Sequence, residues 1–231
     1  MDRRVLTISS IRSTERQIAG GLIAAKPLES ATPAEKLFEV AATSVAESLV
    51  LLCFLKCIAL LISRSASMSA RSKALCGQAA WIVVVQASAL LQGAMQPLAE
   101  PLQPEWYNNL DKPTWVPPPW LFPLMWIPLK LLQTVASAYL WDLNDLRVFT
   151  SPSIMLFVLH LSLGDVWNVQ FFLKRRILTG LLTITAFWLV LASATVSFFR
   201  SNMLAGALLA PSVAWVAVAA TLNLDVWYLN R

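Results

Sequence analysis

The sequence predicts an all-α integral membrane protein, a five-transmembrane-helix bundle that follows an N-terminal extension. Two observations lead to this fold class. Hydrophobic residues make up 57% of the 231 residues and charged residues only 13%, about half the charged share of an ordinary soluble domain. Several nearly uncharged stretches also reach about 20 residues, the length that a helix needs to cross the hydrocarbon core of a bilayer.

The distribution of charge excludes one class of function. The formal net charge is +5, but Lys and Arg concentrate in the N-terminal region and in short connections. They form no basic patch interleaved with exposed aromatic residues, which is the usual signature of nucleic-acid binding. We therefore expect no nucleic-acid partner. Basic residues at the two ends of the predicted helices are balanced and do not orient the chain in the membrane.

The N-terminal extension, residues 1–40, is polar and mixed in charge. Its Arg residues lie among Ser and Thr, as in organelle targeting segments, whereas Asp2 and Glu15 are unusual for such a segment. A targeting segment and a disordered tail both fit this composition. The organelle stays open among mitochondrial, plastid and ER or Golgi membranes.

Residues 41–73 form the next predicted unit. Its apolar run, LVLLCFLKCIALLI, is interrupted by Lys56, and Glu47, which precedes it, counts against a membrane span. Because the run is shorter than a full membrane span, a transmembrane helix and an interfacial helix are both open. A Ser/Arg linker ends the unit, and residues 74–231 form the five-helix membrane domain.

The first span of that domain is expected over residues 74–98, which contain no charged residue. Four glutamines share one arc of this helix: Gln78, Gln86, Gln92 and Gln96. Because hydrocarbon offers no hydrogen-bond partner, the stripe should face protein or a cavity. It is either one wall of a cavity or a set of interhelical hydrogen bonds.

A segment rich in Trp and Pro, residues 106–126, connects the first two spans with the sequence WYNNLDKPTWVPPPWLFPLMW. Its three consecutive prolines, 117–119, withhold backbone donors, so they end one element and can open the next. Trp106, Tyr107 and Trp115 are typical either of a belt at the membrane interface or of a lid over a cavity.

The second span, residues 119–141, contains Pro128, which should kink it, and Lys130 near its middle. An ionisable residue at that depth indicates a functional site. The third span, residues 151–172, carries Asp165 at a depth that agrees with Lys130 within about 5 Å if the two spans are antiparallel. Either the two side chains pair, or Lys130 binds an anionic ligand group while Asp165 has another partner.

One face of the third span carries His160, Gly164, Trp167 and Phe171, which are spaced four, three and four residues apart. His160 is the single histidine of the sequence. It is either a hydrogen-bonded helix contact or, if haem binds, a candidate axial ligand. Apart from that haem role, the sequence predicts no metal site.

The last two spans differ in what they indicate. The fourth, residues 177–199, has Thr and Ser at four-residue spacing, which predicts close packing of helices. The fifth, residues 203–224, places Trp215 and Ala219 on one face, with Asn223 near its end.

Three blocks over about residues 74–231 resemble the translocator protein family (TspO/MBR, tryptophan-rich sensory proteins). The first is the loop spelling WY-x-x-L-x-KP-x-W-x-PP, followed by Trp126. The second, HLSLGDVWNVQFF, is similar to the family's QLxLNxxWxxxFF, and the third, AGALLAPSVAWVAVAATLNLDVW, to its AGxLLxPYxxWxxFAxxLN. Their order and spacing make the resemblance specific.

The resemblance implies a five-helix bundle, usually a homodimer, whose loop-capped cavity binds porphyrins, sterols and synthetic aromatic ligands. It places Trp126 and Trp215 beside the cavity, Trp167 and Ala219 on its wall, and Trp106, Tyr107 and Trp115 in or near the lid. Together with His160, Lys130 and Asn223, these are the candidate ligand-binding residues. Protoporphyrin IX or haem is the expected ligand, with no required cofactor and no catalytic residue.

Departures from the family pattern affect the ligand. His160 stands where the family usually has Gln, Gly164 where it has Asn, and Lys130 where it has Tyr. The Tyr of the family's sterol motif aligns with Leu224, so sterol or other lipid binding is less well supported than porphyrin binding.

Three functions are compatible with these features. The first is a membrane translocator or scavenger of tetrapyrroles. The second is a light-dependent porphyrin-degrading enzyme, with Trp126 and Trp215 as redox-active partners. The third is a stress-regulatory membrane interaction protein. Because the residues offer no independent acid–base or metal constellation, we expect binding rather than catalysis.

Overall fold

The computed structural model of the chain describes residues 31–95 and 104–231, with the side chains of residues 87–95, 104 and 105 excepted. All regular secondary structure within these ranges is helical, which confirms the predicted all-α class. The expectations for the Gln92 and Gln96 side chains and for most of the N-terminal extension fall outside the described residues.

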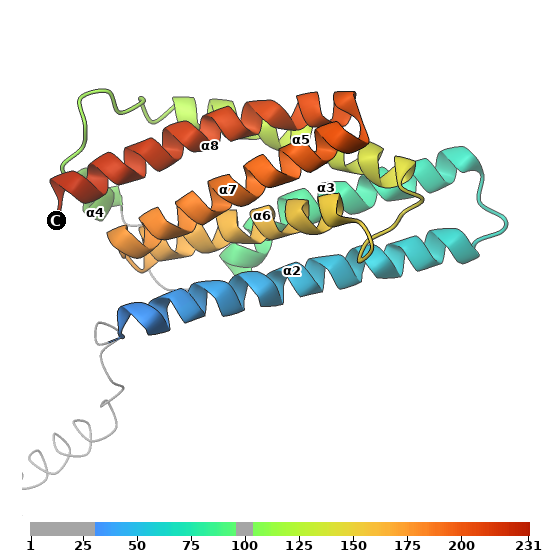
Figure 1. Ribbon diagram of the computed structural model, residues 1–231, viewed down its shortest axis with the longest axis horizontal. Coiled ribbons are helices and arrows are strands. Elements are labelled where there is room, and N and C mark those ends of the chain that lie inside the picture. The colour runs from blue at the N-terminus through green and yellow to red at the C-terminus, as the bar shows by residue number, and fades with distance from the viewer. Residues whose placement is uncertain (1–30, 96–103) are drawn as a thin grey trace, which may run out of the picture. The chain divides into compact units, whose positions relative to one another are not determined.

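The helices, shown in Figure 1, are α2 (Pro33–Arg64), α3 (Ala70–Met95), α4 (Pro104–Asn108), α5 (Leu121–Leu143), α6 (Pro152–Asn168) with its π-helical continuation η2 (Val169–Leu173), α7 (Ile177–Ser201) and α8 (Met203–Leu229). Helix α3 packs against α5 and α6, α6 against α7, and α7 and α5 against α8. Pro128 lies inside α5 and Pro211 inside α8.

Within the described residues, five helical segments are long and apolar enough to cross a membrane: α2, α5, α6 with η2, α7 and α8. The protein is therefore a multi-pass integral membrane protein, as predicted. The set includes α2, which the sequence left open between a transmembrane and an interfacial helix. At 1.5 Å per residue, its 32 residues extend about 48 Å, more than the roughly 30 Å of a bilayer core.

Helix α2 begins well before the expected residue 41 because its start is capped. The backbone N–H of Glu35 donates to Thr32 Oγ1 at 3.2 Å, and the N–H of Thr32 donates to Glu35 Oε2 at 2.7 Å. This reciprocal pair is a capping box, and Pro33 occupies the first helical position, where a missing N–H costs nothing. Capping, rather than the apolar run, determines where the helix starts.

One face of α2 packs on the bundle and the other is exposed. Ser48 Oγ donates to Ser162 Oγ of α6 at 3.0 Å. Glu39 accepts hydrogen bonds from Gln170 Nε2 at 3.1 Å and from Arg176 at 2.9 Å. These contacts fasten α2 beside α6, so that α6 and α7 lie between α2 and α8 (Figure 1).

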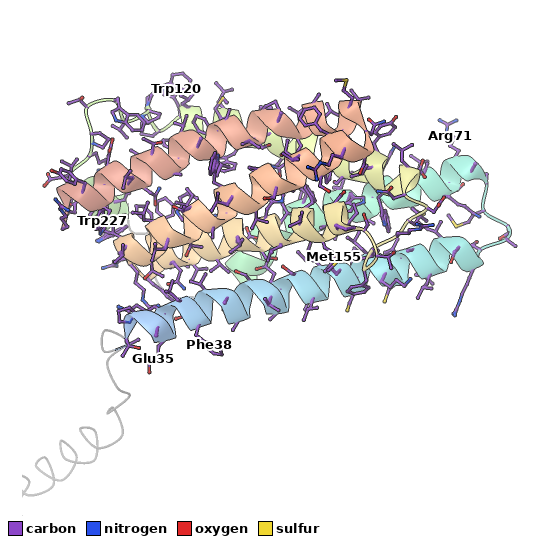
Figure 2. All side chains as sticks on the ribbon, viewed as in Figure 1. Glu35, Phe38, Arg71, Trp120, Met155 and Trp227 are labelled. Atoms are coloured by element: carbon purple, nitrogen blue, oxygen red, sulfur yellow. The ribbon has the colours of Figure 1, made fainter. Side chains whose placement is uncertain are left out.

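Large apolar side chains point outward, as expected of a surface that faces lipid. Phe38 is 74% exposed and Trp120 is 63% exposed, and both extend away from the helices in Figure 2. Trp120 directly follows the proline run at the start of α5 and suits an aromatic belt at the membrane interface. The Trp-rich segment thus supplies a belt residue as well as a lid.

Candidate functional site

A cavity of about 590 Å³ lies at the end of the bundle where α5 begins and α8 ends. Its volume falls within the range of ordinary ligand pockets. Helices α5, α6, α7 and α8, the π-helix η2 and the 107–119 segment all contribute to it. The lining residues are Tyr107, Asn108, Lys112, Val116, Pro117, Pro119, Phe122, Trp126, Lys130, Gln133, His160, Leu161, Gly164, Asp165, Trp167, Asn168, Phe171, Phe172, Phe187, Ala219, Leu222, Asn223 and Val226.

Helical spacing explains why α5 contributes four of these residues, Phe122 in its first turn and three further along. Trp126, Lys130 and Gln133 are four and three residues apart, so they form a row on one face of the helix. Gln133 Nε2 donates to Ser212 Oγ of α8 at 3.0 Å, and this bond joins α5 to α8 at the deep end of the cavity. Sequence reasoning missed Gln133, although its spacing from Trp126 and Lys130 was visible.

The α6 wall is aromatic and is fixed by a hydrogen bond to α8. The indole Nε1 of Trp167 donates to Asn223 Oδ1 at 3.1 Å, and Asn223 Nδ2 donates to the carbonyl of Ala219 at 2.9 Å. The predicted residues Trp167, Ala219 and Asn223 therefore meet in one constellation. Buried indole and amide groups need such partners.

The π-helix η2 adds two aromatic rings, of which helical periodicity placed Phe171 but not Phe172. Phe171 and Phe172 are consecutive, yet both line the cavity, with ring centroids 4.8 Å apart and planes at 86°. A wider turn changes the angle between successive side chains, and such π-bulges are frequent at functional sites. Both residues belong to the block that resembles the family, but the π turn itself had no sequence signal.

The segment before α5 closes the cavity as a lid. Trp106 packs on Phe171 with ring centroids 5.7 Å apart, and Tyr107 packs on Phe172 at 5.6 Å. The Lys112 ammonium lies 4.6 Å from the centre of the Tyr107 ring, a cation–π distance. Burial raises the pKa of Tyr107, so the phenol stays neutral.

Two contacts tie this lid to the end of α8. Trp115 Nε1 donates to Asp225 Oδ2 at 2.8 Å. Asn230 and Asp111 exchange two hydrogen bonds, at 3.1 Å and 2.8 Å. Hydrogen bonds near the membrane surface therefore hold the part of the lid at Asp111 and Trp115, while Trp106 and Tyr107 rest on aromatic rings.

Three predicted residues lie near the cavity without lining it. Trp106 belongs to the lid but contacts Phe171 from outside the hollow. Trp115 is 43% exposed and serves as a lid fastener. Trp215 is only 7% exposed, but it packs behind Trp126, with ring centroids 6.4 Å apart. The helix face of Trp215 is predictable from its spacing, but the position of the Trp126 ring between Trp215 and the cavity is not.

His160 lines the cavity from within an aromatic sandwich. Its ring centre lies 4.5 Å from that of Phe157 and 5.9 Å from that of Phe187. It is 1% exposed, so the structure places it at the cavity wall rather than as a side chain that extends freely into the hollow.

The cavity floor holds the intramembrane charges that the sequence indicated. Lys130 and Asp165 both line the cavity, which agrees with the depth argument. Lys130 Nζ donates to the carbonyl of Val85 in α3 at 3.0 Å. Direct pairing of Lys130 with Asp165 stays a prediction.

Glu47 of α2 joins this polar region from behind α6. It is half-buried, and its carboxyl interacts electrostatically with the Asp165 carboxyl. The sequence treated Glu47 as an argument against a span. The structure supplies the physical reason why α2 tolerates it: the side chain faces protein, where an ionisable group costs far less than in lipid.

These helices define the class, a multi-pass membrane protein with an aromatic ligand-sized cavity under a lid. The sequence pattern of the TspO/MBR family matches residues 79–229, and the chain belongs to this family. Helix α2 precedes the matched region.

Named relatives agree with this assignment. The chain is 35% identical to Protein CrtK of Rhodobacter capsulatus over 54% of this chain and 78% of the relative. It is 32% identical to a tryptophan-rich sensory protein of Cereibacter sphaeroides, over 54% and 77% of the two chains. It is also 32% identical to the Translocator protein of Homo sapiens, over 54% and 75%. Family membership supports a translocator role in the membrane.

Proposed function

We propose that the protein binds a flat tetrapyrrole, protoporphyrin IX or haem, in the aromatic cavity and carries or sequesters it in the membrane. The observation that supports this most directly is a cavity of about 590 Å³ whose walls are mostly aromatic and apolar, with a few polar groups. Trp167, Phe171 and Trp126 offer ring faces and edges against which a planar macrocycle can pack.

The two lysines of the cavity suit the acidic side chains of such a ligand. Lys112 lies in the lid and Lys130 on the α5 wall, so a propionate at either end of the hollow would meet an ammonium group. Charge-assisted hydrogen bonds of this kind fix orientation more strongly than neutral ones. A sterol would use neither charge, and we therefore rank sterols and other lipids below tetrapyrroles. Homodimer formation also belongs to this proposal.

The test is a tryptophan-fluorescence titration of the purified full chain with protoporphyrin IX, haem and cholesterol. Tetrapyrroles should quench the emission with saturable binding, and cholesterol should not compete. Trp126→Leu should weaken porphyrin binding about tenfold, because it removes a ring from the wall. Trp120→Leu, at an outward-facing tryptophan, is the matched control and should bind normally. Equal losses in both variants would contradict a cavity site.

Haem tests the role of His160 separately. If His160 is an axial ligand, His160→Ala should shift the haem Soret band while leaving protoporphyrin affinity within about twofold. An unchanged Soret band would remove the axial role and leave the aromatic cavity as the whole site.

A second candidate is light-dependent degradation of bound porphyrin. The contact between Trp126 and Trp215, at 6.4 Å between ring centroids, favours it because one indole lines the cavity and the other stands behind it. Anaerobic and aerobic illumination of the porphyrin complex, with Trp215→Phe as the variant, separates the two functions. A new product spectrum that requires Trp215 would support the enzyme, whereas unchanged porphyrin would support the carrier.

A regulatory interaction role would depend on the N-terminal extension. A variant without residues 1–30 keeps the whole of α2 and tests the extension. Retained ligand binding together with a lost cellular effect would support this third function.

A further inference from the structure

A second hollow, of about 410 Å³, lies between the start of α3, the end of α5 and the start of α8. We call it the interfacial groove. It stands at the opposite ends of α5 and α8 from the aromatic cavity, and it shares no lining residue with that cavity. Its wall differs as well, since it has two aromatic rings, Tyr139 and Trp141, among charged, amide and apolar side chains.

The groove is charged at one end and apolar at the other. Lys73 and Asp142 lie within a few residues of the helix ends at Ala70 and Leu143. Ile82 is nine residues further along α3, about 13 Å deeper at 1.5 Å per residue. The groove therefore runs from the depth of lipid headgroups into the depth of acyl chains.

The two charges of the groove have no partners within the described part of the chain. Neither the Lys73 ammonium nor the Asp142 carboxylate makes a hydrogen bond or an ion pair with another described side chain. A cation and an anion that share one groove without pairing can each receive an opposite charge from a ligand. A ligand that carries both signs satisfies both groups, whereas a sterol satisfies neither.

The deeper walls are open to hydrocarbon. Ile82, Val135 and Leu204 line the groove and remain more than half exposed, so an acyl chain lying along them would bury apolar surface. At Gly77 the absence of a side chain leaves the Trp141 ring as part of the floor, with ring atoms 3.9 Å from where a Cβ would stand. A bulky residue at Gly77 would fill this space.

From this charge and depth pattern we propose that the interfacial groove binds a zwitterionic glycerophospholipid. The Lys73 ammonium receives the phosphate, the Asp142 carboxylate receives the headgroup ammonium, and one acyl chain follows the apolar wall between α3 and α8. The site is independent of the tetrapyrrole proposal, because it uses other residues at the other end of the helices. It would join α3 to α8 through a bound lipid.

Native mass spectrometry of the full chain tests this, using detergent micelles that contain phosphatidylcholine, phosphatidylglycerol or cholesterol. The unaltered protein should retain phosphatidylcholine in preference to the other two. Lys73→Gln should reduce retention of both phospholipids about tenfold, the loss of one charge-assisted contact. Asp142→Asn should reduce phosphatidylcholine alone and so invert the preference toward phosphatidylglycerol.

The matched control is Arg147→Gln. Arg147 lies near the same end of the bundle, is 65% exposed, and pairs with Asp145 at 3.8 Å outside the groove. Its loss should leave all three retentions unchanged. Equal retention of the three lipids by the unaltered protein, or equal effects of Asp142→Asn on both phospholipids, would overturn the proposal. Melting temperatures should stay within about 2 °C for all variants, since none of these side chains is buried.

Discussion

Aromatic rings gather toward both ends of the bundle, but in different ways. At one end, called the filled end, they pack on one another beside the interfacial groove, and at the other, called the hollow end, they line the aromatic cavity. In the filled end, Trp81 packs on Trp141 with ring centroids 5.9 Å apart and on Phe157 at 5.6 Å, and all three are fully buried. In the hollow end, Trp126 and Trp167 line a cavity of about 590 Å³. Abundance of tryptophan therefore does not by itself define a binding site.

What differs is the element that covers the rings. In the filled end, Trp81, Trp141 and Phe157 come from α3, α5 and α6, whose mutual packing brings the rings together. In the hollow end, a lid that contains only the short helix α4 covers the rings, and it rests on Phe171 and Phe172 instead of inserting between helices. A lid of this kind covers the cavity without filling it, whereas another helix in its place would insert side chains into that space.

The largest expected effect is on the filled end. Trp81→Ala should lower the free energy of unfolding by about 3–5 kcal/mol, because it leaves a cavity among buried rings. Porphyrin affinity of the folded protein should change by less than about threefold. Thermal melting in detergent and a fluorescence titration measure the two quantities. If Trp81→Ala lowered porphyrin affinity but not the free energy of unfolding, Trp81 would belong to the binding site and the contrast between the two ends would be wrong.

A smaller loss of stability, with a larger loss of binding, is expected at the hollow end. Trp167→Phe keeps a ring but removes the hydrogen bond to Asn223, which costs about 1–3 kcal/mol when a buried partner is left unsatisfied. The wall then loses its fixed orientation, and porphyrin affinity should fall about tenfold. Asn223→Ala removes the same bond from its other side and should reproduce the affinity loss. If neither variant alters porphyrin binding, the Trp167 wall is not part of the site.

The smallest effect is expected at Gly164, where the hollow meets the filled core. A Cβ there would stand 3.2 Å from Phe187 Cζ and 3.4 Å from Cε1, so the ring would shift by a few tenths of an ångström. Gly164→Ala should lower porphyrin affinity about twofold and change stability by less than about 1 kcal/mol. Gly77→Ala, whose Cβ meets only ordinary contacts at 3.9 Å, serves as its control. A collapse of folding in Gly164→Ala would show that Phe187 has no room to yield.

Helix α2 illustrates where sequence reasoning was incomplete. The apolar run predicts a helix from residue 41, whereas the capping box at Thr32 and Glu35 makes the helix start earlier. Glu47 counted against a span because a sequence does not reveal which neighbour a side chain meets. Only the position of α2 beside α6 provides Asp165 and Ser162 as polar neighbours.

The sequence by itself determined the all-α membrane class, the family, and the shared face of α6 and η2 that bears Trp167 and Phe171. These follow from composition, from helical periodicity and from local motifs, all of which act over a few neighbouring residues. The tertiary structure alone decided that Trp126 lines the cavity while Trp215 stands behind it, and that η2 turns Phe171 and Phe172 into the same hollow. Which ring stands in front of another depends on how separate helices meet, and side-chain spacing along one helix contains no information about that.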